Sequence, residues 1–347
     1  MVVDSQRKSS TRSAERPPLN WLILKPLLRR GATCIITSHY SPDGDAIGSE
    51  LALALFLKQI GVVPHIINQS PVPRIYEFLD ETGLAKVYTE ADDELIMNAD
   101  VLIVLDASTW DRIGTPAKVM RATGARRVCI DHHATNDGIA DIDMIDPTEA
   151  AAAMLVYDMI NAFAGKITPA IARALFVGIG TDTGWFRFSN TSARVFDVAA
   201  ELTRKGAVPG DLHSRVYEQL RWERMALLAR GFSHLHSAAD GKIAWMTLTR
   251  KMFTEAAADD EDVEGIVDLL RTVAGIEIVL LFREAAGGMV RVSLRSKGHA
   301  DVGRLAEQFG GGGHARAAGI RMRGTLQEVI DKVTRAAEHE LAAEGKR

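Results

Sequence analysis

The chain contains few cysteines, no long apolar segment and no large excess of charge of either sign. Its two cysteines, Cys34 and Cys129, lie in predicted buried strands, which excludes a disulfide framework and is typical of the reducing cytoplasm. No apolar run approaches the roughly 20 residues of a transmembrane helix, and residues 1–18 lack the apolar core of a signal peptide. The net charge of −4 argues against overall electrostatic binding of long nucleic acids, so a nucleic-acid substrate should be short and bound locally.

The length of 347 residues favours two domains, and the hydrophobic fraction of 47% is ample for two cores. We predict a disordered tail (1–18), an α/β domain (19–205), a helical linker (206–230) and a smaller α+β domain (231–347). In the first domain, short apolar strands alternate with helices, which is typical of a parallel sheet with helices on both faces.

Histidine and aspartate residues follow several apolar segments of the first domain. Asp131, His132 and His133 come after residues 128–130, and Asp106 comes after residues 101–105. His39 follows residues 32–37, together with the acidic positions 43 and 45, and Asp182 follows residues 176–180, which we interpret as a buried helix rather than a strand. Single histidines could be core residues with satisfied hydrogen bonds, but carboxylates at several strand ends favour a pair of divalent cations, Mn²⁺ above others.

These motifs carry a family resemblance. The pattern His39-x-x-x-Asp43-x-Asp45, with Asp106, the triplet at 131–133 and Asp182, resembles the four metal motifs of the DHH phosphoesterase superfamily. The glycine run 310–313 followed by His314 resembles the signature of the associated DHHA1 domain. Both signatures in this order are similar to the nanoRNase/pAp phosphatase family, over residues 19–342.

The resemblance implies a set of metal ligands and catalytic residues. One Mn²⁺ would be held by His39, Asp43 and Asp106, and a second by Asp45, Asp106, His132 and Asp182, with Mg²⁺ as a substitute. Asp106 would bridge, since two neighbouring cations need a shared carboxylate. His133 would contact the substrate phosphate, and Asp131 would orient the neighbouring histidines.

Local geometry adds two expectations near these ligands. We expect residues 43–49 to form a turn before a helix from 46 to 60, because a turn lets Asp43 and Asp45 point to different metals. Gly44 and Gly48 would let the backbone approach a metal or phosphate. Arg112 lies either near this site or on the surface. The aromatic residues in loop 183–190 either stack on a base or, more in keeping with their composition, pack in the core.

The second domain supplies the predicted substrate-binding residues, in an active site placed in the cleft between the domains. Glycines 310–313 offer unobstructed N–H groups that can bind a phosphate, although a glycine run can also be a flexible linker. The resemblance implies that Arg295 and His314 bind a terminal phosphate or sugar. The full set of candidates is Arg187, Arg295, Ser296, Gly311, Gly312, Gly313, His314 and Arg316.

We therefore expect a cytoplasmic Mn²⁺-dependent phosphoesterase that hydrolyses RNA oligomers of two to five nucleotides to mononucleotides, and also adenosine 3′,5′-bisphosphate (pAp) to AMP. Two alternatives stay open: a phosphodiesterase of cyclic or linear diadenylate, and a non-catalytic nucleotide-binding regulator. The composition disfavours a long-strand exonuclease, and the motif at His314 disfavours an inorganic pyrophosphatase. No membrane partner is expected, and a homodimer is compatible with the sequence.

Overall fold

A computed structural model describes residues 19–263, 265–297 and 300–344 of the chain. The predicted tail, residues 1–18, lies outside these residues. The chain divides into two compact units between Gln219 and Leu220, inside the segment that the sequence predicts as a linker. No helix in the described part of the chain is both long enough and apolar enough to cross a membrane.

The first unit is built on a parallel sheet with the spatial order β3-β2-β1-β4-β5-β6. Its strands are β1 (Thr33–Thr37), β2 (Val63–Asn68), β3 (Ala85–Val87), β4 (Val101–Leu105), β5 (Arg126–Asp131) and β6 (Ile142–Ile145). The chain proceeds from β1 outward to β3 and then returns to β4 on the other side of β1. Because ligands bind beyond the carboxyl ends of strands where the order reverses, this topology points to the ends of β1 and β4.

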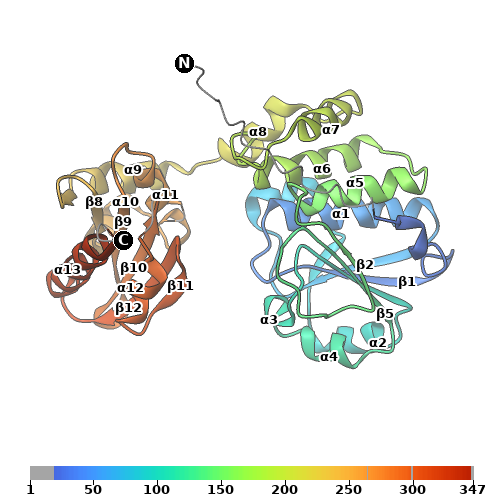
Figure 1. The fold of residues 1–347 in the computed structure, drawn as a ribbon, viewed down its shortest axis with the longest axis horizontal. Coiled ribbons are helices and arrows are strands. Elements are labelled where there is room, and N and C mark those ends of the chain that lie inside the picture. Colours follow the sequence, from blue (N-terminus) through green and yellow to red (C-terminus); the bar gives the residue numbers. More distant parts are fainter. Residues whose placement is uncertain (1–18, 264, 298–299, 345–347) are drawn as a thin grey trace, which may run out of the picture. The chain divides into compact units, whose positions relative to one another are not determined.

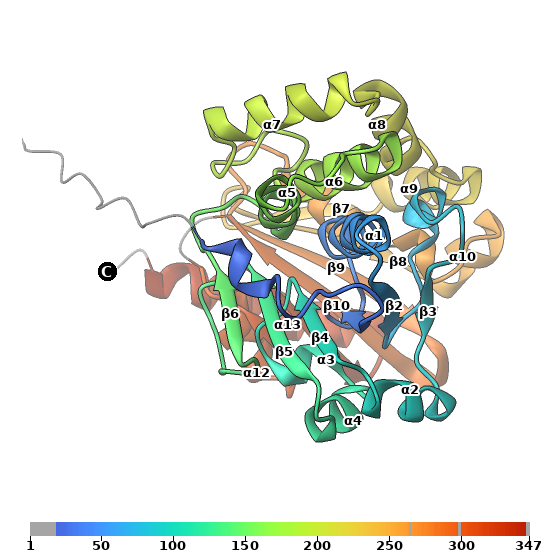
Figure 2. The ribbon, with the colours of Figure 1, turned by 90° about the vertical axis from the view of Figure 1, so that its right-hand side faces the viewer.

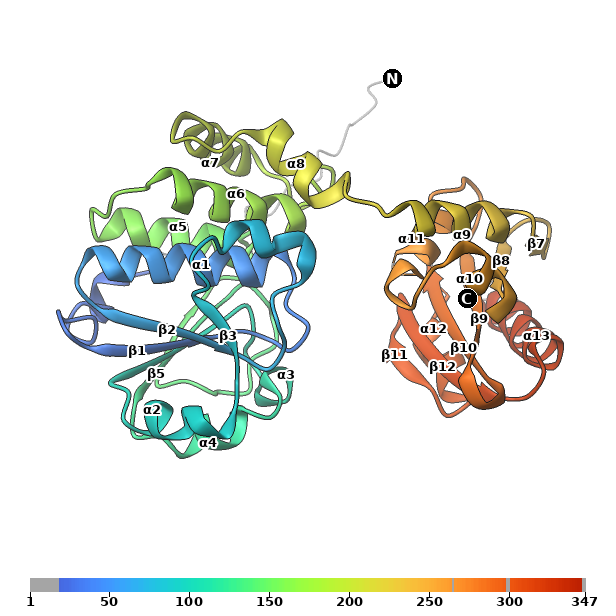
Figure 3. The same cartoon turned by 180° about the vertical axis from the view of Figure 1, so that it is seen from behind.

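Helices cover both faces of this sheet, as predicted (Figures 1 and 3). Helices α1 (Gly44–Gln59), α5 (Ala152–Ala162) and α6 (Pro169–Asp182) cover one face, and α2 (Asp93–Met97), α3 (Trp110–Ile113) and α4 (Ala117–Ala122) cover the other. Alternate residues of β1 divide between the two cores, with Cys34 and Ile36 on the α1 side and Ile35 on the α4 side. Figure 2 shows β4, β5 and β6 side by side with α5 and α6 along one face.

Helices α7 (Ala193–Arg204) and α8 (Pro209–Tyr217) complete the first unit and contact α6. Two expectations about helices are settled here. Residues 176–180 lie within α6, so the helical interpretation is confirmed. The segment predicted as a helical linker, residues 206–230, is not one continuous helix, because α8 ends at Tyr217 and α9 begins at Trp222. The break has a packing cause, since Leu212 joins the core of the first unit whereas Leu227 joins a core of the second.

The second unit is a mixed sheet in the order β11-β12-β10-β9-β8-β7. Its strands are β7 (Leu235–Ala238), β8 (Ile243–Leu248), β9 (Ile278–Ala285), β10 (Met289–Ser296), β11 (Gly312–His314) and β12 (Ala317–Arg323). Among the strand pairs of the described residues in this unit, β8–β9 alone is parallel. Helices α12 (Val302–Glu307) and α13 (Leu326–Glu344) pack on one face, and α9 (Trp222–Phe232), α10 (Arg250–Ala256) and α11 (Ile266–Arg271) on the other. Short 3-10 helices occupy Trp21–Leu24, Arg74–Leu79, Glu90–Asp92, Glu261–Val263 and Ala286–Gly288.

Candidate active site

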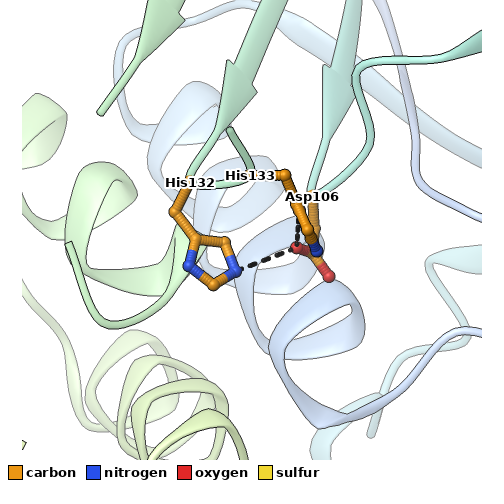
Figure 4. Close-up of side chains that lie close together, drawn as sticks. All are labelled: Asp106, His132 and His133. Atoms are coloured by element: carbon orange, nitrogen blue, oxygen red, sulfur yellow. Dashed lines mark ion pairs between the residues drawn. The ribbon is translucent and has the colours of Figure 1, made fainter. Parts of the chain in front are cut away.

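Histidine and aspartate side chains from distant segments meet at the carboxyl edge of the first sheet. His39 follows β1, Asp106 follows β4, and His132 follows β5. Three overlapping groups each bring three ligand atoms within 4.8 Å of one another: Asp106–His132–His133, His39–Asp43–Asp106 and Asp45–His132–Asp182. Figure 4 shows the ring of His132 pointing toward the carboxylate of Asp106. The structure thus brings together all six predicted metal ligands.

Asp106 lies at the centre of the cluster. Its Oδ2 is 3.3 Å from Nε2 of His39, and its Oδ1 is 3.4 Å from Nε2 of His132 and 3.5 Å from Nδ1 of His133. Its backbone has a φ of 53°, in the left-handed region that non-glycine residues rarely adopt. Such strain concentrates at functional sites, where the surrounding structure fixes a side chain in one direction.

The two acidic residues at the start of α1 are positioned differently from the sequence expectation. The expected turn over 43–49 is wrong, because α1 already begins at Gly44. Asp43 is the N-cap, and its carboxylate accepts hydrogen bonds from the N–H groups of Asp45 and Ala46. Asp45 lies in the first turn and is fully buried. The side chains of Asp43, at the N-cap, and Asp45, in the first helical turn, therefore point to different ligand groups although no separate turn precedes the helix.

Asp45 also fixes the position of α5. Its two carboxylate oxygens accept hydrogen bonds from the N–H groups of Ala152 at 2.6 Å and Ala153 at 2.9 Å. These N–H groups belong to the first turn of α5, where no residue of the helix itself can accept from them. His132 approaches the same carboxylate, with 3.9 Å between its Nε2 and Oδ2.

The chemistry of this cluster fits divalent cations. Nε2 of His39 and Oδ1 of Asp106 are buried, and neither has a hydrogen-bond partner among the described residues. Buried polar atoms of this kind are costly unless a partner satisfies them. Carboxylate oxygens and imidazole nitrogens in one cluster are ligands that Mn²⁺ accepts. The cluster could therefore hold one cation on the His39 side and another on the Asp182 side of Asp106.

Burial and neighbouring charges shift the pKa values of the cluster. Burial raises the pKa of Asp45 well above its usual range, and the nearby charge of Asp106 adds to this effect. Burial alone would lower the pKa of His132, but the neighbouring carboxylates of Asp106 and Asp182 outweigh it and raise this pKa to about 11. Several carboxylates crowded into a buried space need positive charge to stabilise them.

Comparisons with known proteins agree with this geometry. Residues 33–179 match the model of the DHH family, N-terminal domain, and residues 241–343 match the DHHA1 domain. A bifunctional oligoribonuclease and PAP phosphatase of Thermus thermophilus is 33% identical over 318 residues, which are 89% of this chain and 90% of that protein. The chain belongs to the DHH family. It is a hydrolase of the phosphodiesterase and phosphatase type.

Two further relatives lie at lower identity. The protein with the same description from Bacillus subtilis is 26% identical, across 83% of this chain and 88% of that one. The crystal structure of an exopolyphosphatase-related protein from Bacteroides fragilis superposes with a TM-score of 0.84 at 28% identity, covering 93% of this chain and 95% of that chain. Both relatives span the two units, so the DHH and DHHA1 parts occur together in them.

His133 is held beside the ligands by two partners in this DHH unit. Its Nδ1 is 2.7 Å from Oδ1 of Asp131, which also accepts a hydrogen bond from the backbone N–H of His133. Its Nε2 is 3.3 Å from Nη1 of Arg112, so Arg112 lies near the site rather than away from it. In the tautomer whose Nδ1–H donates to Asp131, Nε2 can accept from Arg112. The side chain of His133 is 36% exposed, which leaves it accessible to a ligand.

The predicted substrate-binding residues fall into different places. Arg295, Gly311 and Gly312 line a cavity of about 860 Å³ in the DHHA1 unit. Ser296 points to the opposite face of β10, where it is buried and its hydroxyl donates to the carbonyl of Ala315. The remaining candidates do not line this cavity. Gly313, His314 and Arg316 lie on or next to β11, and Arg187 belongs to the first unit, where its Nε donates to the carbonyl of Gly184.

The aromatic residues of loop 183–190 pack mainly against one another and against α6 and α8. Trp185 makes edge contacts with Phe176, Phe186, His213 and Tyr217. This arrangement agrees with core packing for Trp185 and Phe186. Phe188 differs, since 53% of it is exposed.

Glu50 and Asn68 support the end of β1, and neither residue was among the predicted members of the site. The side-chain oxygen of Asn68 accepts from the N–H of Ser38 at 3.2 Å and from the hydroxyl of Thr37, and its amide donates to Glu50 at 2.8 Å. This network fixes the backbone next to His39. The available signal was a polar residue at the end of β2, the strand beside β1, in a position that a buried apolar residue would ordinarily occupy.

Replacement of Glu50 by glutamine should change how stability depends on pH. Burial raises the pKa of Glu50 from 4.5 to about 7, against the opposing hydrogen bonds of Asn68 and Ser38. The folded state therefore binds a proton more tightly than the unfolded state, and wild-type stability should decline as pH rises from 4.5 to 7. The free energy of unfolding should fall by about 3 kcal/mol over this range. Glutamine does not titrate, so the Glu50→Gln variant should lack this pH dependence.

Thermal unfolding of the chelator-treated protein at pH 5 and pH 8 measures this effect. We expect the melting temperature of Glu50→Gln, relative to wild type, to be higher at pH 8 than at pH 5. If the difference in melting temperature between Glu50→Gln and wild type is the same at both pH values, Glu50 is already ionised in the folded protein at pH 5.

Proposed function

We propose that the chain is a two-metal phosphoesterase that hydrolyses oligoribonucleotides of two to five nucleotides to mononucleotides, and pAp to AMP. The observation that carries this proposal is the position of Asp106, shared between ligand groups on both of its sides. The names of the relatives support the substrate class, since those proteins are described as oligoribonuclease and PAP phosphatase.

The residues of the site have distinct tasks in this proposal. His39, Asp43 and Asp106 would hold one Mn²⁺, and Asp45, Asp106, His132 and Asp182 the other, with Mg²⁺ as a substitute. When bound, such a pair lowers the pKa of water and stabilises the charge that develops on phosphoryl oxygens.

His133 and Arg112 act on the substrate in this proposal. Arg112 can donate to a phosphoryl oxygen that enters beside Asp106, and His133 can donate to the same oxygen through Nε2 once both ring nitrogens carry a proton and Nε2 no longer accepts from Arg112. Asp131 keeps the ring of His133 oriented and stabilises a positive charge on it. In the DHHA1 unit, Arg295 and the backbone of Gly311 and Gly312 would bind another part of the nucleotide.

A side-by-side turnover assay with Mn²⁺ tests the proposal. The substrates are linear diadenylate, pAp, cyclic diadenylate and a long single-stranded RNA. We expect rapid release of AMP from the first two and little from the others. Preference for cyclic diadenylate would replace the proposed substrate by a second messenger, and the absence of any turnover despite bound metal would favour a nucleotide-binding regulator.

A further inference from the structure

Three arginines form a row across the sheet of the second unit. Arg291 on β10 is paired in register with Arg283 on β9 and with Arg321 on β12. Residues directly opposite one another on antiparallel strands project from the same face, with about 5 Å between their Cβ atoms. We call these three residues the arginine row. Like charges in such positions destabilise a sheet, so the row calls for an explanation other than folding.

The row lines the cavity of about 860 Å³ that also contains Arg295. Side chains alternate along β10, and Val290, Val292 and Leu294 are buried on the opposite face. The face with the arginines is left open beside α11, with Ser293 and Gly319 next to the row. Small residues there leave the guanidinium groups accessible from the cavity.

The positive charge of the row is only partly balanced within the described residues. Asp260 is 3.0 Å from Nη1 of Arg283 and 3.8 Å from Nη1 of Arg291. Its side chain is 66% exposed, and it makes no other ion pair with a described residue. Arg321 is exposed and makes no ion pair with any residue that the structure describes.

Electrostatics within the row favours a bound anion. Burial lowers the pKa of Arg283, and the neighbouring charges of Arg291 and Arg321 lower it further against the effect of Asp260. An anion among the three guanidinium groups would relieve this repulsion. A phosphate group fits the fork of a guanidinium with two hydrogen bonds, and it would displace the exposed carboxylate of Asp260.

The guanidinium group of Arg295 is held by partners of its own, Asp268 at 3.2 Å and the carbonyl of Leu294 at 3.0 Å, and not by the row. Arg291 and Arg295 project from the same face of β10 four residues apart, which corresponds to roughly 13–14 Å along a strand. With Arg295 held in this way, a ligand that carries anionic groups at a similar spacing can contact both positions without moving either side chain. Successive backbone phosphates of an oligonucleotide satisfy this condition.

We propose that Arg283, Arg291 and Arg321 form a phosphate-binding site for the backbone of an oligoribonucleotide, separate from the group bound at Arg295. This inference rests on the proposed function and extends it, because it assigns the preference for oligomers over a single nucleotide to the arginine row. Asp260 acts as a competing internal anion. Removal of the arginine charge should therefore weaken binding of the oligomer, and removal of the charge of Asp260 should strengthen it.

The test compares the double variant Arg291→Gln/Arg321→Gln, the variant Asp260→Asn, and the control Arg335→Gln. Arg335 is exposed on α13, which packs on the other face of the sheet. Hydrolysis of pAp and of oligoadenylates from two to five nucleotides gives kcat/KM for each substrate. We expect the ratio of kcat/KM for the pentanucleotide to that for pAp to fall about ten-fold or more in the double variant, to rise in Asp260→Asn and to stay unchanged in Arg335→Gln.

Binding of a non-hydrolysable fluorescent oligoadenylate, followed by anisotropy on the same variants, separates this inference from the proposed function. If the wild type hydrolyses none of the substrates, the proposed function fails, whereas the order of affinities still decides the role of the arginine row. Three results would overturn the inference. They are an unchanged ratio of kcat/KM values in the correctly folded double variant, a fall of this ratio in Arg335→Gln as large as in the double variant, and weaker binding of the oligoadenylate by Asp260→Asn.

Discussion

Replacement of Asp106 by asparagine should reduce hydrolysis of linear diadenylate and pAp by about a thousand-fold or more. Asparagine has nearly the same shape, so the change removes the negative charge and little else. That charge lies within 3.5 Å of nitrogen atoms from His39, His132 and His133, and it is the one carboxylate shared by two of the three ligand groups. Without it, two neighbouring cations would lose the ligand that offsets their repulsion.

Titration with Mn²⁺ should reveal the loss of this shared ligand without any measurement of turnover. We expect wild-type protein to bind two Mn²⁺ ions and Asp106→Asn to bind at least one of them more weakly. The matched control is Asp197→Asn, on the exposed side of α7, which should retain both activity and binding. Full activity of a folded Asp106→Asn variant would exclude the proposed two-metal mechanism.

Much of this site could be predicted from the sequence, because its ligands follow elements whose ends must meet. Asp106 and His132 each follow a buried apolar strand, and parallel strands place their carboxyl ends at one edge. Asp182 lies at the end of a helix, α6, and not after a strand. Its position was still predictable, because the argument required only that an apolar helix or strand end just before it. The predicted role of residues in the second unit depends on a ligand, and it stays a prediction.

The features that sequence analysis did not find depend on the register between strands or on contacts between distant segments. Alternation along β10 shows that Arg291 faces away from the apolar core, but nothing in the sequence pairs it with Arg321 on β12. In the same way, the hydrogen bond between Asn68 and Glu50 requires the packing of α1 against the end of β2. Pairings of this kind become visible only when both segments are placed in space.

Gly48 has a packing role that the sequence alone did not indicate. The sequence suggested that it lets the backbone approach a metal or phosphate. In the structure, a Cβ atom at Gly48 would lie 2.4 Å from the carbonyl oxygen of Ala174 and 3.1 Å from the backbone nitrogen of Gly178. The glycine therefore permits close packing of α1 against α6, the two helices that carry Asp45 and Asp182.

Replacement of Gly48 by alanine should consequently lower both stability and affinity for Mn²⁺. Alanine favours a helix by up to about 1 kcal/mol over glycine, so the intrinsic effect alone would be stabilising. The clash is with backbone rather than with a flexible side chain, and relief of it requires α1 and α6 to separate. Overpacking of this kind typically costs about 1–3 kcal/mol, which outweighs the gain in helix propensity.

The control for this variant is Gly210→Ala, because a Cβ atom at Gly210 in α8 would meet no atom within 4 Å. We expect Gly210→Ala to unfold at the same temperature as wild type or higher, and to keep its affinity for Mn²⁺. Gly48→Ala should unfold at a lower temperature and bind Mn²⁺ more weakly, since Asp45 and Asp182 would move apart. If Gly48→Ala is destabilised but binds Mn²⁺ as wild type does, the spacing of α1 and α6 serves the fold alone, and the metal ligands tolerate its change.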